Sequence, residues 1–391
     1  MKYDFDRVIG RKGSGSIKWD FAPRLYGGDD VLPMWVADMD FAAPEPVLDA
    51  LRKRLEHPVL GYGTEPDSLK KAVAERMKRL FGWEVDPDWV LSMPGVVPSM
   101  YAAVSAYSQP GDGVLVQSPV YPPFFDVIRE QGREPLMNVL EYESGFGHRI
   151  DTGDFASKCG AGRLFLLCSP HNPGGRVWSR EELSAMADEI CNSGGVIVSD
   201  EIHHELVFSG NTHIPIASLS PEIADRSVTC VAPSKTFNIA GLSASAVIIP
   251  NSLLREQFKK ARNHGIPWAN ILGLTAFEAA YRYGDEWLAQ VLAYLETNRN
   301  LVSAAVSGMP GIEEVAPQGT FLSWLDCRGL ESAGENIEML FSRKAKVGLN
   351  AGRTFGPGGE GFMRLNFGCP RSILEEGLAR IREAVDSVSR S

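Results

Sequence analysis

The chain has 391 residues, 44% of them hydrophobic, so it can bury a sizeable core and is long enough for two or three domains. Its formal net charge is -10 and its isoelectric point is near 5.3. Nucleic acids and anionic membranes bind basic surfaces, so neither is expected as a partner. No apolar signal segment follows Met1, and no run approaches the roughly 18 apolar residues of a membrane span. These features are expected of a cytoplasmic protein.

The cysteine and histidine patterns indicate neither a disulfide framework nor a metal site. The six cysteines are widely spaced and include no Cys-x-x-Cys pair. Cys168, Cys230 and Cys327 lie within apolar runs, which favours buried thiols over disulfides. His203 and His204 are adjacent, whereas two zinc ligands on one helix face need the His-Glu-x-x-His spacing. We therefore expect no metal ion.

The middle of the chain alternates short apolar runs with amphipathic segments. Helices are predicted over 97–108, 122–131 and 181–193, and strands over 114–117, 163–168, 196–199, 228–231 and 246–249. Pro-Gly, Gly-Gly and Asn-Pro pairs lie at the joins. This alternation predicts an α/β domain with a mostly parallel sheet that helices cover on both faces.

The pattern changes from residue 287 onward. One long helix is predicted over 287–307, and a Gly-Met-Pro-Gly sequence ends it. The next predicted elements are a strand over 320–326, a helix over 335–346, a strand over 361–367 and a terminal helix from Arg371. These elements predict a smaller α+β domain, which the N-terminal segment joins. We expect a large domain at 45–286 and a small domain made of 1–44 and 287–391.

Three polar clusters follow apolar runs, each at the carboxyl end of a predicted strand. They contain Asn172, Asp200 and Lys235. Ligands bind at this edge of an open α/β sheet, and an amide, a carboxylate and an amine together there are what a pyridoxal phosphate (PLP) site requires. Lys235 would link covalently to the cofactor, Asp200 would keep its pyridine nitrogen protonated, and Asn172 would bind its phenolic oxygen. The alternatives are a helix cap for Asp200 and a solvated surface position for Lys235.

Five segments spread over the chain resemble one enzyme family. They are Met34–Phe41, Gly61–Gly63, Ser169–Pro173, Asp200–His203 and Met363–Phe367. Together they resemble the fold-type I PLP-dependent enzymes, the class I/II or aspartate aminotransferase superfamily. Within it, the chain is most similar to the MalY- and PatB-like branch of cystathionine β-lyases (C–S lyases). The resemblance implies an aspartate aminotransferase-like fold, PLP as cofactor, an amino-acid substrate and a homodimer with shared active sites.

The cofactor phosphate is expected at the turn where Gly95, Val96 and Val97 lead into a predicted helix. Backbone N–H groups at a helix N-terminus bind anions, and a glycine allows close backbone approach. The alternative is an ordinary strand-to-helix turn. The resemblance adds Ser234 as a phosphate ligand and, from the partner subunit, Tyr62.

Two positions depart from the superfamily pattern. Ala232 stands three residues before Lys235, where the superfamily often has Ser or Thr. Ser243 stands eight residues after Lys235, where aspartate aminotransferase-like members have Arg. We therefore expect fewer side-chain partners for the phosphate than these relatives provide.

The resemblance assigns the remaining site residues. Tyr121 matches the aromatic that stacks on the cofactor ring, a contact that contributes about 0.5–1.5 kcal/mol; the alternative is a core tyrosine. His203 is expected beside the phenolic oxygen, at a position where many relatives carry Tyr. Arg364 matches the arginine that pairs with the substrate α-carboxylate, the alternative being an edge residue that reaches water. Trp35 and Val36 are expected to close over the substrate.

These residues predict chemistry at the α-carbon of an amino acid. After the Cα proton is removed, the same cofactor residues serve transamination or, with a good leaving group on Cβ, elimination. We favour β-elimination at the carbon–sulfur bond of L-cystathionine or a related cysteine thioether, giving a thiol, pyruvate and ammonia. The alternatives are an aminotransferase of broad or aromatic specificity and a regulatory protein that retains the fold.

Overall fold

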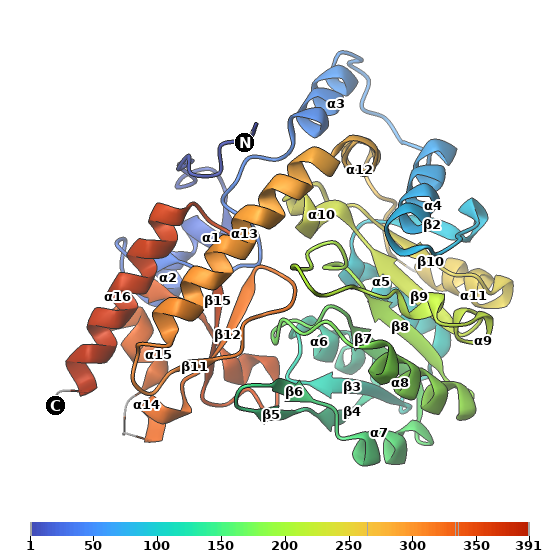
Figure 1. The fold of residues 1–391 in the computed structure, drawn as a ribbon. Helices are drawn as coiled ribbons and strands as arrows, with labels where there is room; N and C mark the ends of the chain where they lie inside the picture. Colours follow the sequence, from blue (N-terminus) through green and yellow to red (C-terminus); the bar gives the residue numbers. More distant parts are fainter. Residues whose placement is uncertain (1, 264, 333, 335, 390–391) are drawn as a thin grey trace.

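The structure, a computed structural model, describes residues 2–263, 265–332, 334 and 336–389. Its larger sheet has seven strands (Figure 1). Their order is β2 (Val90–Met93), β10 (Ser245–Ile248), β9 (Ser227–Val231), β8 (Val196–Asp200), β7 (Gly162–Cys168), β3 (Gly113–Ser118) and β4 (Glu134–Val139). β10 is antiparallel to both neighbours, and the other strands share one direction. The predicted, mostly parallel sheet is therefore confirmed.

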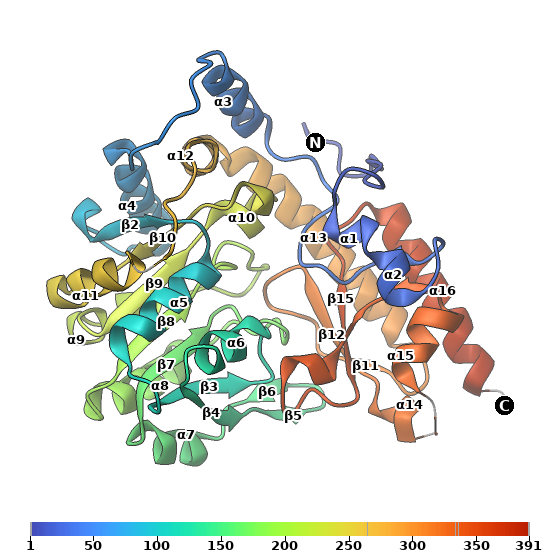
Figure 2. The same ribbon diagram turned by 180° about the vertical axis from the view of Figure 1, so that it is seen from behind.

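Helices cover both faces of this sheet, which Figures 1 and 2 show from opposite sides. One face carries α5 (Val96–Tyr107), α6 (Pro123–Arg129) and α11 (Ser252–Arg262), and the other carries α7 (Thr152–Cys159), α8 (Arg180–Asn192) and α9 (Pro221–Ala224). Successive residues of a strand point to opposite faces. Leu164 and Leu166 thus pack under α5 and α6, whereas Phe165 and Leu167 pack against α8. Burial on both faces explains why the central strands are almost wholly apolar.

A smaller antiparallel sheet lies beside the first. Its order is β11 (Glu313–Glu314), β12 (Leu322–Asp326), β15 (Phe362–Asn366) and β14 (Asn350–Ala351). The long helices α13 (Asp285–Val306) and α16 (Arg371–Ser389) share a buried cluster with it. β14 is an edge strand of this sheet, and its residue Asn350 lines two neighbouring cavities.

The remaining elements are short or lie outside the two sheets. They are α1 (Ile17–Asp20), α2 (Ala22–Tyr26), β1 (Leu32–Pro33), β5 (Glu141–Glu143), β6 (Gly147–Arg149), α10 (Pro233–Thr236), α14 (Arg328–Ser332), α15 (Ile337–Met339) and β13 (Val347–Gly348). Short 3-10 turns occupy 87–89, 216–218, 240–242 and 352–355. β1 pairs in parallel with β13, and β5 forms a hairpin with β6. The β1–β13 pair joins a segment near the N-terminus to the last third of the chain.

Three helices form a separate group at the top of Figure 1. They are α3 (Glu45–Leu55), α4 (Asp67–Phe81) and α12 (Ile271–Tyr283), and α12 packs on the other two. Segment 56–66 crosses from α3 to α4 without helix or strand. This segment carries Tyr62, so its surroundings matter for the predicted site.

Two predicted elements differ in detail from the structure. The strand expected from Thr320 starts at Leu322, because Thr320 has a positive φ of 71° that no strand residue adopts. The helix expected over 335–346 is the short α15 followed by a π-helical turn at Leu340–Lys344, and Glu335 lies outside the described residues. The division into 45–286 and 1–44 with 287–391 stays a prediction.

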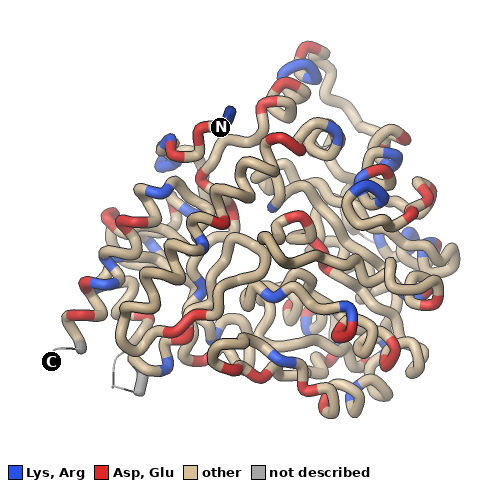
Figure 3. Tube along the Cα trace, viewed as in Figure 1, with Lys and Arg blue, Asp and Glu red and all other residues tan. Residues whose placement is uncertain are grey.

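None of the described helices is long and apolar enough to cross a bilayer. Figure 3 shows acidic and basic residues interspersed over the outer helices. Cys168, Cys230 and Cys327 are buried, as the sequence predicted, and so are Cys159 and Cys369. No group of His, Cys, Asp and Glu suited to a metal ion occurs among the residues described.

Candidate active site

Every predicted site residue except Tyr62 lines one cavity of about 370 Å³ at the carboxyl edge of the larger sheet. The predicted residues in it are Trp35, Val36, Gly95, Val96, Val97, Tyr121, Asn172, Asp200, His203, Ser234, Lys235 and Arg364. β7, β8 and β9 are neighbours in the sheet, so the polar clusters that follow them meet at one edge. Arg364 comes from β15 of the smaller sheet and closes the other side.

Lys235 lies in α10, directly after β9, and its side chain is half-buried. Its Nζ donates a hydrogen bond to the carbonyl of Ala37 at 2.7 Å. The pKa of Lys235 is lowered to about 8, mainly by desolvation and also by the charge of Arg364, while Asp38 and Asp200 act in the opposite sense. A neutral amine is therefore accessible near neutral pH, as a nucleophile or base requires.

Asp200 is a buried carboxylate at the end of β8, with 5% of its surface exposed. It lies in register with Cys168 on one side and Cys230 on the other, and its Oδ1 accepts a hydrogen bond from the N–H of Ile202 at 3.0 Å. Desolvation raises its pKa to about 7. Within the described chain it has no ion-pair partner, although a buried carboxylate needs one. A protonated pyridine nitrogen supplies that partner, so Asp200 fits the PLP ring.

Arg364 presents a buried guanidinium to the same cavity. It donates to Asn172 Oδ1 at 2.9 Å, to the carbonyl of Trp35 at 2.8 Å and to Asn350 Oδ1 at 2.7 Å. Its Nε has no hydrogen-bond partner in the described structure, and no carboxylate pairs with it there. Desolvation lowers its pKa to about 10, so the group remains charged at neutral pH. The site thus offers an unpaired cation that fits a substrate carboxylate.

The N-terminus of α5 fits the cofactor phosphate. Gly95 caps this helix with a φ of 152°, a conformation that favours glycine. The N–H groups of Val96 and Val97 have no acceptor among the described residues, and helix N-termini attract anions. Ser234 and Ser243 line the same cavity, and Ser243 has a left-handed backbone with a φ of 48°. The cradle therefore consists mainly of backbone donors.

Tyr121 and His203 complete the walls of the cavity. Tyr121 is half-buried, and its backbone N–H donates to the carbonyl of Asn172 at 3.1 Å. Burial raises the pKa of the Tyr121 hydroxyl, so the side chain is neutral. His203 is 2% exposed, and its Nδ1 lacks a partner in the part of the chain described. Burial first, and then the charge of Lys235, lowers the pKa of His203 well below its usual value, so this ring is also neutral.

Residues 35–37 line one wall of the cavity, and the segment 34–41 that contains them is held from two sides. Asn238 makes three hydrogen bonds to the backbone of this segment at 2.7–2.9 Å, and Asn366 donates to two of its carbonyls. Asp40 in this segment pairs with the buried Lys18 at 2.6 Å. Asn238, Asn350 and Asn366 were not among the predicted site residues. Only the left-handed φ of 55° at Asn238 is a local feature, and it is not visible in the sequence.

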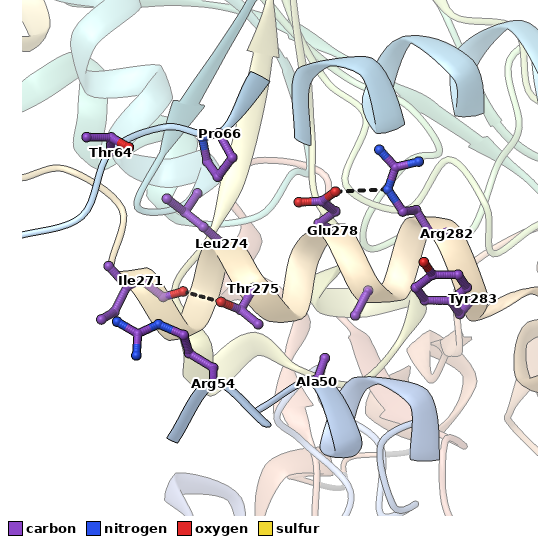
Figure 4. A pocket seen from close by; sticks show the side chains of 11 residues that line it. Ala50, Arg54, Thr64, Pro66, Ile271, Leu274, Thr275, Glu278, Arg282 and Tyr283 are labelled. Carbon is purple, nitrogen blue, oxygen red and sulfur yellow. Dashed lines mark hydrogen bonds and ion pairs between the residues drawn. The ribbon is translucent and has the colours of Figure 1, made fainter. Parts of the chain in front are cut away.

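Tyr62 lies apart from the cavity and is fully exposed. With segment 60–65 and residues 267–272 it lines a wider hollow of about 920 Å³. A further hollow of about 400 Å³ runs along α12, and Figure 4 shows Glu278 and Arg282 paired there. That pair has a distance of 2.9 Å, and Arg54 donates to the carbonyl of His57. These hollows contain no buried amine or carboxylate among their described residues, so the chemistry belongs to the first cavity.

The fold and this cavity are those of PLP-dependent enzymes with the aspartate aminotransferase-like fold, which confirms the fold class and the cofactor predicted from the sequence. The chain belongs to the aminotransferase class I and II family, whose family model matches residues 29–381.

Individual relatives match over almost the whole chain. It is 44% identical to the protein named cystathionine β-lyase PatB of Bacillus subtilis, over 98% of this chain and 100% of the relative. It is 33% identical to protein MalY of Escherichia coli, over 99% of this chain and 100% of the relative. The crystal structure of cystalysin from Treponema denticola, which contains PLP, matches with a TM-score of 0.94 at 36% identity, over 99% of this chain and 100% of that chain. The predicted branch is thereby confirmed.

Proposed function

We propose that the protein is a PLP-dependent C–S lyase that cleaves L-cystathionine or a related cysteine thioether by β-elimination. The products are a thiol, pyruvate and ammonia. The observation that carries the proposal is the 44% identity to cystathionine β-lyase PatB over 98% of the chain. The cavity supports it, because an accessible amine, a buried carboxylate and an unpaired guanidinium suit chemistry at the α-carbon of an amino acid.

In this proposal the residues around the ring hold and tune the cofactor. When bound, PLP supplies an electron sink for negative charge at the substrate α-carbon. Asp200 keeps a proton on the pyridine nitrogen, because the pair relieves its unpartnered burial. Asn172, His203 and Tyr121 line the cavity. The first two would bind the phenolic oxygen of the cofactor, and Tyr121 would stack on its ring. Within one chain, the backbone at residues 95–97 and Ser234 bind the phosphate.

Lys235 and Arg364 act on the substrate. Arg364 binds the α-carboxylate, and Trp35 and Val36 cover the bound amino acid. Lys235 takes the Cα proton, which its lowered pKa permits. The Cβ–S bond then breaks with its electron pair going to sulfur, and the thiolate takes a proton. The three-carbon remainder is hydrolysed to pyruvate and ammonia.

The proposal includes a cytoplasmic homodimer in which Tyr62 reaches the phosphate site of a second copy. Its support is the full exposure of Tyr62 beside the exposed apolar side chains of Val59, Leu60 and Trp268. Sedimentation should give a dimer. If sites are shared, mixing inactive Lys235→Ala and Tyr62→Ala chains should restore part of the activity, since one site of each hybrid is intact. No recovery in verified hybrids would contradict sharing.

The decisive assay compares two reactions of the purified, PLP-loaded protein. Pyruvate and thiol release from L-cystathionine is measured beside amino-group exchange with a keto acid. Release of both products supports the lyase, whereas exchange without thiol release overturns it in favour of an aminotransferase, the activity for which the family is named. Lys235→Ala should abolish turnover and the visible absorbance of the linked cofactor. A physiological effect that survives this change would instead support a regulatory role.

A further inference from the structure

A second cavity, also of about 370 Å³, adjoins the active site. We call it the distal cavity. It is lined by Leu25, Tyr26, Trp35, Glu338, Phe341, Ser342, Val347, Leu349, Asn350, Ala351, Arg353, Thr354 and Met363. Trp35 and Asn350 also line the active-site cavity, so these two residues form the boundary between them. The distal cavity therefore begins beside the group that holds Arg364.

The two cavities meet at the edge strand β14. Asn350 pairs in register with Arg364, and Ala351 pairs with Met363. Neighbouring residues of a strand face opposite sides, so Asn350 and Arg364 face the active site while Ala351 and Met363 face the distal cavity. No further strand follows β14 in this sheet among the described residues. The two cavities therefore adjoin at an edge of the sheet that no further described strand covers.

Tyr26 lies between the charges of the two cavities. Its ring packs edge-on against Trp35 with 6.0 Å between centroids, and its hydroxyl donates to the carbonyl of Leu349 at 2.9 Å. Burial raises the pKa of Tyr26; Arg364 lowers it, and Glu338 raises it. Tyr26 is thus within electrostatic reach of both the arginine of the active site and the carboxylate of the distal cavity.

The distal cavity combines apolar walls with one pair of opposite charges. Leu25, Phe341, Leu349 and Met363 supply the apolar surface. Arg353 donates to both carboxylate oxygens of Glu338, through Nε and, at 3.0 Å, through Nη2. The side chains are 64% and 40% exposed, so solvent reaches the pair and a charged ligand can replace part of it. Tyr26 lies on α2 and Glu338 on α15, two helices that lie near each other on the right of Figure 2.

We propose that the distal cavity binds the part of a thioether substrate beyond sulfur, with Arg353 pairing a distal carboxylate and Glu338 a distal ammonium. The inference rests on the proposed lyase function. The apolar walls suit the methylene groups that separate such a zwitterionic end from sulfur. The site would therefore favour thioethers that end in an amino-acid group, such as L-cystathionine, over S-alkyl cysteines, which leave both charges unused.

The proposal is tested with two variants and four substrates. Arg353→Gln and Glu338→Gln each remove one charge, and the substrates are L-cystathionine, S-carboxyethyl-, S-aminoethyl- and S-methyl-L-cysteine. Arg353→Gln should raise KM about three- to tenfold for L-cystathionine and the carboxyethyl compound, a range set by the exposure of the pair. Glu338→Gln should do so for L-cystathionine and the aminoethyl compound. The methyl compound should change less than about twofold with either variant.

The crossed pattern separates substrate recognition from a structural ion pair between α15 and the turn at 352–355. A structural role would change KM for all four substrates alike, and that result overturns the proposal, as does no change for any of them. Arg149→Gln is the matched control, because Arg149 forms a comparably exposed pair with Glu143 outside both cavities. If the wild type cleaves none of the four, the lyase proposal fails. In that case the dissociation constants of the same four compounds are measured by cofactor absorbance. The inference is overturned if the two variants do not show the same dependence on the distal charges.

Discussion

Replacing Asp200 by asparagine should stabilise the cofactor-free protein at neutral and alkaline pH. Burial raises the pKa of this carboxyl from 3.8 to about 7 in the folded protein. Because the folded value lies above the unfolded value, the folded state binds more protons between these limits. The stability of the folded protein with Asp200 protonated is fully present below about pH 4, and this stability is lost progressively as the pH rises through about 7. A neutral amide of similar shape avoids this loss.

The size of the effect follows from the shift. One pKa unit corresponds to about 1.4 kcal/mol, so the raised pKa of Asp200 costs about 2 kcal/mol of stability near pH 5, where folding takes up a proton, and about 4 kcal/mol near pH 8, where the buried group is ionised. With an unfolding entropy of about 2.1 cal/mol/K per residue, 4 kcal/mol raises the midpoint of a 391-residue chain by about 5 °C. The gain should fall to about half near pH 5. The attraction of Lys235, which lowers the pKa of Asp200, is already included in the value of about 7.

Thermal unfolding of wild type and Asp200→Asn, both stripped of cofactor, tests this from about pH 5 to about pH 8. The exposed Asp188→Asn is the matched control and should leave the midpoint unchanged at either pH. Adding PLP should then raise the wild-type midpoint more than that of the variant, because the pyridine N–H pairs with the carboxylate. A variant that is less stable than wild type at high pH, or a gain independent of pH, would refute the reasoning.

Three further predictions follow from the cavity. Arg364→Lys should raise KM for the amino acid by about ten- to a hundredfold with a smaller change in kcat, since one ammonium cannot make two parallel hydrogen bonds; steady-state kinetics would show this. Asn238→Ala, which frees backbone groups of residues 39–41, should lower stability by about 2–3 kcal/mol in thermal unfolding. In cofactor-free protein the amine-labelling rate of Lys235 should rise through about pH 8, because its lowered pKa releases the proton early; a rise near pH 10.5 would contradict this.

The sequence predicted the positions of those site residues that directly follow a recognisable strand. Asn172, Asp200 and Lys235 each follow a short apolar run, and such runs form neighbouring parallel strands here. The carboxyl ends of parallel strands meet at one edge, so chain order sufficed to bring the three residues together. Arg364 needed the family resemblance, because an arginine between apolar strand residues has no local feature that distinguishes a buried site from an edge.

Other site residues depend on contacts between distant parts of the chain. Asn350 meets Arg364 because β14 pairs with β15, and neither strand gives a sign of that register. Asn366 and Asn238 hold a segment more than 190 residues away in sequence. Thr320 was placed in a strand by its composition, although its contacts with the chain near Leu206 impose a positive φ. In the proposed homodimer the surroundings of Tyr62 include a second copy, and the pattern of one sequence gives no register for such a contact.

Segments near the two ends of the chain jointly close the candidate active-site cavity. One wall comes from segment 34–41, which is synthesised early. Strand β15 holds this segment by hydrogen bonds and is among the last parts of the chain to leave the ribosome. A nascent chain that lacks the final thirty residues or so therefore holds the lysine and the aspartate but no anchor for a carboxylate. Shortening either terminus up to these points removes part of the cavity itself, so fusion partners and truncations belong outside them.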